Sequence, residues 1–194
     1  MARQNNGERM KQASRRTRIG NASDLVRFYQ RLGFFPGIPQ ARVIRAYRED
    51  MGCVPDARNP IFDADLLLGD EERTCSIPGV GCIGPDSGFY RQVLPELARL
   101  TGGAFAPAEI VELWETRRGP IRVKFRLALH TIIVTARWKK SAPDLYVLQQ
   151  INSFLTSQEG RFECMGLGIR VVMWLTREQK LTIQRERGNV DFWW

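Results

Sequence analysis

The fold is decided by the stretch Ile121-Arg122-Val123-Lys124-Phe125-Arg126-Leu127 and by the run His130–Trp138 that follows it. Apolar and cationic residues alternate in the first stretch, and this two-residue period is typical of a strand with one buried face. The second run is rich in β-branched residues, which favour strands. Because only a short connection separates the two runs, we expect them to pair as a β-hairpin.

After this hairpin the sequence predicts a helix, two strands and a last helix. Apolar residues at helical spacing predict a helix over Asp144–Ser157. Strands are expected at Arg161–Met165 and Ile169–Leu175, because the glycines between them favour a tight reversal. A capping-box pattern, threonine followed three residues later by glutamine, begins a last helix over Thr176–Arg187. Residues 119–188 are therefore predicted to form a ββαββα unit.

The chain before residue 119 is predicted to be helical. Helical periodicity covers Asp24–Leu32, with Ser23 as its N-cap, and resumes over Gln40–Met51. Two further helices are expected over Ser87–Thr101 and Pro107–Thr116, the second beginning with proline at its first position.

A long loop rich in glycine and proline is expected over Gly52–Ser87, interrupted only by a short helix or strand at Ala64–Leu68. Its acidic part, Asp63–Glu72, is interpreted as a solvated surface rather than as a cation or acid/base site. Cys75 and Cys82 could crosslink this loop in an oxidising compartment and stay reduced otherwise.

The fold class predicted from these elements is α+β, with a mainly antiparallel sheet flanked by helices. A chain of 194 residues has the length of one domain. We expect a basic flexible arm over 1–22, one domain over 23–188 that is helical over 23–118, and an aromatic tail over 189–194.

The positive charge of the chain is concentrated at one end. Lysine and arginine total 29 against 21 acidic residues, a net charge of +8. The first 18 residues contribute six cations and one acid, or +5, and their cations are Arg3, Arg9, Lys11, Arg15, Arg16 and Arg18. Such an arm attracts polyanions by releasing their counterions, or it serves only to keep the chain in solution. The charged start does not read as a secretory signal, so a cytoplasmic location is expected.

A second group of cations lies in and beside the predicted hairpin. Arg122, Lys124 and Arg126 share one strand face, and three more cations follow the second strand, namely Arg137, Lys139 and Lys140. This set is either a basic ridge that binds a partner or an ordinary exposed sheet face. The terminal aromatics Phe192, Trp193 and Trp194 either dock on the parent domain or anchor in a partner's groove.

Few residues in this sequence support catalysis. A cysteine hydrolase would need Cys82 or Cys164 beside His130, the single histidine, with Asp144 as the group that orients it. The glycine pattern Gly79–Gly84 matches a dinucleotide motif by letters but lacks the strand before it and the helix after it. The cysteine spacing does not suit structural zinc. No cofactor and no metal ion are predicted.

Three functional hypotheses remain. The leading one is a non-enzymatic interaction protein that binds an acidic partner, nucleic acid or protein, through the basic arm and the cationic strand face. The second is a bacterial partner-neutralising protein of the immunity or antitoxin kind, which would use the Asp63–Glu72 segment or the terminal aromatics. The third is the cysteine hydrolase.

Overall fold

The computed structural model describes residues 19–77, 84–85, 87–137, 144–156, 158–166, 170–188, 190 and 192. Within these residues the fold is α+β, with six α-helices and two antiparallel sheets of three strands each. One sheet has the strand order β1-β6-β5 and the other the order β2-β3-β4. The strands are β1 (Thr74–Ile77), β2 (Pro107–Trp114), β3 (Ile121–Leu127), β4 (His130–Ala136), β5 (Gly160–Met165) and β6 (Arg170–Thr176).

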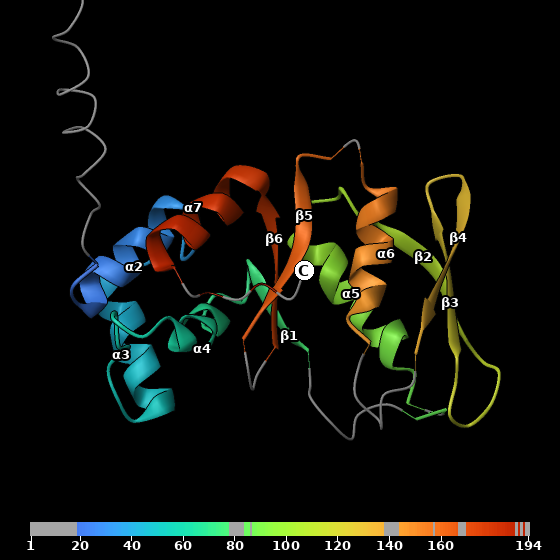
Figure 1. Ribbon diagram of the computed structural model, residues 1–194, viewed down its shortest axis with the longest axis horizontal. Coiled ribbons are helices and arrows are strands. Elements are labelled where there is room, and N and C mark those ends of the chain that lie inside the picture. The colour runs from blue at the N-terminus through green and yellow to red at the C-terminus, as the bar shows by residue number, and fades with distance from the viewer. Residues whose placement is uncertain are drawn as a thin grey trace, which may run out of the picture.

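The helices lie on both sides of the β1-β6-β5 sheet (Figure 1). On one side are α2 (Ala22–Arg31), α3 (Gln40–Met51), α4 (Asp63–Leu68) and α7 (Arg177–Arg187), and a 3-10 turn, Pro60–Phe62, precedes α4. On the other side α5 (Phe89–Leu100) and α6 (Tyr146–Phe154) lie between this sheet and the β2-β3-β4 sheet (Figure 1).

Two hydrophobic cores result, one on each face of the β1-β6-β5 sheet. Successive residues of β6 point to opposite faces, so Val172 joins the core with α5 and α6, while Val171 and Met173 join the core with α2, α3, α4 and α7. These three residues are fully buried. A strand that is covered on both faces reads as a continuous apolar run, as β6 does.

The two hairpins and the last helix were predicted correctly. β3 pairs with β4 and β5 pairs with β6, both antiparallel. The capping box of α7 is present: the Gln179 backbone N–H donates to the Thr176 hydroxyl at 3.2 Å, and the Thr176 N–H donates to the Gln179 side chain at 2.8 Å.

The predicted helix over Pro107–Thr116 is wrong, because this segment is strand β2 and pairs with β3. Its apolar residues Ile110, Val111 and Trp114 have the spacing of a helical stripe, whereas in a strand Val111 faces away from the other two. Pairing with β3 decides between the two, and the register shifts between Ala108 and Val111. The region 23–118 is therefore not wholly helical.

The long loop expected over Gly52–Ser87 is also more ordered than predicted. It contains the 3-10 turn, helix α4 and strand β1, which pairs with β6. At the start of the fold, Asn21 rather than Ser23 caps α2, since its side chain accepts the Asp24 N–H at 2.9 Å. Ile19 packs against the core, so the folded part begins before residue 22.

Helix α6 connects the two sheets through two amide side chains. The Gln150 side chain accepts the Thr135 N–H of β4 at 2.9 Å and donates to the Thr135 carbonyl at 2.8 Å. The Asn152 side chain accepts the Phe162 N–H of β5 and donates to the Phe162 carbonyl, both at 2.9 Å. Each side-chain amide thus makes the two backbone hydrogen bonds, at Thr135 or at Phe162, that a neighbouring strand would make in a larger sheet.

Among the described residues, every helix is too short or too polar to cross a membrane.

Candidate binding surface

The cations of β3 point away from the core because of the strand's alternation. Ile121, Val123 and Phe125 are buried, so the residues between them face outward and are exposed. The structure therefore brings Arg122, Lys124 and Arg126 onto one exposed face. We call the exposed side of the β2-β3-β4 sheet the outer sheet face. It consists of Val111, Leu113, Arg122, Lys124, Arg126, Thr131, Ile133 and Thr135.

Aliphatic side chains accompany these cations on the outer sheet face, which the sequence did not reveal. In the pairing register Lys124 lies between Val111 of β2 and Ile133 of β4, and Leu113 lies beside Arg122. Val111, Leu113 and Ile133 are 44%, 51% and 54% exposed. Val111 and Leu113 are neighbours on β2, and Ile133 lies across Lys124 from them, so the outer sheet face alternates exposed aliphatic and cationic side chains.

Two of the three β3 cations have carboxylate partners. Arg122 is 2.5 Å from Glu115 and Arg126 is 3.0 Å from Glu109. All four side chains are about half exposed, so each ion pair contributes little to stability. Lys124, at the centre, has no ion pair or hydrogen bond with any described residue.

Further cations lie at the end of the sheet where β2 turns into β3. Arg117 and Arg118 are exposed in this turn, and the sequence reasoning missed them because it considered only cations in and next to the hairpin strands. Arg137, just after β4, is exposed as well. Lys139 and Lys140 lie outside the described residues, as do the six cations of residues 1–18.

Asp144 has a structural position rather than a catalytic one. Its buried carboxylate accepts the Arg137 N–H at 2.8 Å and the Tyr146 N–H at 3.3 Å. These bonds fix the start of α6 against the end of β4. His130 is exposed at the other end of β4, at its first residue.

Cys75 and Cys164 do not have the environment of a reactive thiolate. Cys164 on β5 and Cys75 on β1 both pair with Val172 of β6 and so flank it in one row. Burial raises the pKa of the Cys164 thiol to about 12 and that of Cys75 to about 11. His130 belongs to the other sheet, so the structure does not form the dyad with Cys164. Cys82, and any crosslink to it, lies outside the described residues.

The first of the terminal aromatics lies against the folded body. Phe192 forms a β-bridge with Met165 and packs at the edge of the core that contains α7. The Lys180 ammonium is 5.2 Å from the centre of its ring, within the range of a cation–π contact. Trp193 and Trp194 lie outside the described residues.

The interpretation of Asp63–Glu72 as a solvated acidic surface is wrong for two of its carboxylates. Asp63 is fully buried, and the Arg187 guanidinium donates to its two oxygens at 2.6 and 2.8 Å. The Tyr29 hydroxyl donates to the same carboxylate at 2.6 Å. Asp70 is buried too, and it accepts the Phe35 N–H. Burial raises the pKa of both carboxyl groups.

Within the described part of the chain, acidic, histidine and cysteine side chains form no group of three or more that could hold a metal ion. Comparison of the whole chain with protein-family models, with curated proteins and with solved structures finds no match.

Proposed function

We propose that this protein is a non-enzymatic interaction protein that binds an acidic partner protein on the outer sheet face. The proposal rests on the row Val111–Lys124–Ile133. In this row a cation that has no carboxylate partner among the described residues lies between two exposed aliphatic side chains. A partner that presents a carboxylate within an apolar surface would complement this row. The basic arm would add a longer-range attraction for the same partner.

The chemistry of the face favours a protein over a nucleic acid. Sheet surfaces that bind single-stranded RNA stack its bases on aromatic rings, and the outer sheet face as defined has none. Glu109 and Glu115 already pair with two of the three β3 cations, so the face does not present the row of free cations that a phosphate backbone would need. The aliphatic residues, in contrast, gain from burial against another protein, by roughly 1 kcal/mol for each half-exposed side chain.

The test compares an acidic polypeptide with a nucleic acid on the same protein. Fluorescence anisotropy measures binding of labelled polyglutamate and of labelled oligo-dT of equal length. Lys124→Glu should weaken polyglutamate binding by about tenfold, since it replaces an attraction with a repulsion. Arg45→Glu is the matched control, because Arg45 is exposed on α3 and the change in net charge is the same. This control should bind within about twofold of the wild type, and binding should weaken as salt rises.

Two results would contradict the proposal. Equal losses in Lys124→Glu and Arg45→Glu would mean that only the net charge matters. Tighter binding of oligo-dT than of polyglutamate, lost in Lys124→Glu, would assign the outer sheet face to nucleic acid. A third variant, with the six cations of residues 1–18 changed to glutamine, separates the arm from the face. It should slow association and leave the effect of Lys124→Glu in place.

The partner-neutralising protein and the cysteine hydrolase stay predictions, and fewer residues now support each of them. The partner-neutralising role loses Asp63 and Asp70 as contacts because both are buried. The cysteine hydrolase loses Cys164 as an activated nucleophile because burial raises its pKa.

A further inference from the structure

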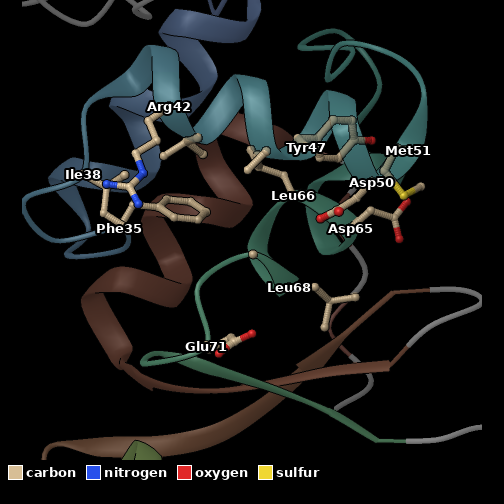
Figure 2. Close-up of a pocket in the computed structure, with 13 residues that line it drawn as sticks. Phe35, Ile38, Arg42, Tyr47, Asp50, Met51, Asp65, Leu66, Leu68 and Glu71 are labelled. Atoms are coloured by element: carbon tan, nitrogen blue, oxygen red, sulfur yellow. The ribbon is translucent and has the colours of Figure 1, made fainter.

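A cavity of about 390 Å³ lies between α3 and α4, away from the outer sheet face. Its volume falls within the range of clefts that hold small organic ligands, about 300–1,000 Å³. Figure 2 shows its lining, which comes from α3, from α4 and from the connections that flank them.

The floor of the cavity is apolar and already formed. Phe35, Val43, Tyr47 and Leu66 line it and are nearly completely buried within the fold. Phe35 has a φ of 51°, a left-handed conformation that a phenylalanine rarely adopts. The buried Asp70 carboxylate accepts its N–H and holds it there. Non-glycine residues held in such conformations cluster at ligand sites, because the surrounding structure must stabilise the strain.

The rim of the cavity is acidic although the protein as a whole is basic. Asp50, Asp65 and Glu71 line it together with one cation, Arg42, which gives the lining a net charge of −2. In Figure 2 the Asp50 and Asp65 side chains are at the end of the cavity where Tyr47 lies, and Arg42 lies at the other end. The chain's net charge of +8 makes a local excess of carboxylates notable.

Asp65 contributes a half-buried carboxylate to this rim. Its side chain is half-buried, and among the described residues no hydrogen bond or ion pair involves it. Burial raises the pKa of its carboxyl group, so the charged form is poorly solvated. Asp63, two residues earlier, is paired with Arg187, whereas Asp65 lines the cavity and has no ion pair with any described residue.

We propose that this cavity binds a small organic cation with an apolar body, whose ammonium lies between Asp50 and Asp65 and whose apolar part packs on Phe35 and Leu66. The apolar floor speaks against a bare metal ion, which would need polar ligands on all sides. The carboxylates speak against a fatty acid or another anionic ligand. The cavity shares no residue with the outer sheet face, so the proposed ligand site does not depend on the proposed function.

The test uses two probes with one ring system and opposite charge. Isothermal titration calorimetry measures binding of tryptamine, a cation, and of indole-3-propionate, an anion, to the full chain. Tryptamine should bind at least about tenfold more tightly, because the rim attracts one charge and repels the other. Asp65→Asn should then weaken tryptamine binding by about tenfold. The shape of the residue is kept, so the cavity stays intact.

Glu49→Gln is the matched control, since Glu49 is exposed on α3 next to Asp50 but does not line the cavity. It removes the same charge and should change tryptamine binding by less than about twofold. Circular dichroism checks that each variant is folded. Should Asp65→Asn unfold, Asp50→Asn replaces it, because Asp50 is exposed and tolerates the change.

Three results would overturn the proposal. They are the absence of saturable tryptamine binding up to millimolar concentrations, equal affinity for the two probes, and equal losses in Glu49→Gln and the lining variant. A failure here leaves the polyglutamate test on Lys124 unaffected, since the two experiments use different probes and different residues.

Discussion

Replacing Arg187 with methionine tests what the buried ion pair does. The Arg187 side chain is 5% exposed and that of Asp63 is fully buried, so the variant leaves a carboxylate inside the protein without its cation. Three hydrogen bonds disappear, two to Asp63 and one to the Ala57 carbonyl at 2.7 Å. Loss of one partner from a buried pair costs about 3–5 kcal/mol. That is a large part of the roughly 5–15 kcal/mol by which a domain is stable.

Two further variants show whether the loss comes from the charge or from the packing. Tyr29→Phe removes one hydrogen bond to the carboxylate and should cost about 1.5–3 kcal/mol. The triple variant Tyr29→Phe, Asp63→Leu, Arg187→Met removes every polar member together. It should be more stable than Arg187→Met alone, because a well-packed apolar group can replace a buried pair at little cost.

The stability loss in Arg187→Met also has an expected pH dependence. Burial already raises the pKa of Asp63 in the folded protein, and removal of the guanidinium raises it further. The folded variant then holds a proton that the unfolded chain releases, so its stability falls as pH rises between the two pKa values. The loss relative to wild type should therefore be smaller at about pH 5 than at about pH 7.

Urea denaturation followed by far-ultraviolet circular dichroism measures these differences, with unchanged m-values as the check on two-state behaviour. A loss below about 1 kcal/mol in Arg187→Met would refute the reasoning, because it would mean that water reaches Asp63 in the folded protein. A triple variant as unstable as Arg187→Met would likewise show that packing, and not the unpaired charge, accounts for the loss.

Two other predictions concern α6 and the cysteines. Asn152→Ala removes the two hydrogen bonds between its side-chain amide and the backbone of the buried Phe162, and should lower the free energy of unfolding by about 2 kcal/mol. Gln150→Ala, at a more exposed position, should cost below about 1 kcal/mol in the same urea titration, and equal losses would contradict this ranking. Iodoacetamide at about pH 8 should modify the exposed Cys53 and spare Cys75 and Cys164, as mass spectrometry would show. The raised pKa values leave only about 10⁻³ of Cys75 and about 10⁻⁴ of Cys164 as the reactive thiolate at this pH. Modification of all three at one rate would mean that the buried thiols are accessible.

The elements that sequence predicts well are those whose signals are local. The alternation in Ile121–Leu127 and the capping box at Thr176 each depend on a few neighbouring residues, and both are found as expected. Strand β2 was missed because its apolar residues have helical spacing, and its pairing with β3 overrides this local signal. Strand β1 has only four residues, and its place is set by β6 near the other end of the chain.

The candidate binding surface was predicted in part for the same reason. The outward direction of Arg122, Lys124 and Arg126 follows from alternation within one strand. Their aliphatic neighbours belong to β2 and β4, so the mixed character of the face depends on the register of three strands. The acidic cavity was not predicted, because no local pattern distinguishes the buried Asp63 from the half-buried Asp65. The difference comes from Arg187, far along the chain, which pairs with Asp63 and not with Asp65.

The side-chain amides of Gln150 and Asn152 on α6 also oppose self-association of the protein through its strand edges. At the positions of Thr135 and Phe162 they occupy backbone groups of β4 and β5 that would otherwise be open to a strand from a second molecule. Both strands lie at the margin of their sheets, so one displaced helix would uncover two templates for self-association at once. Changes that loosen α6 should therefore first increase self-association on storage, before any change in the folded core is detected.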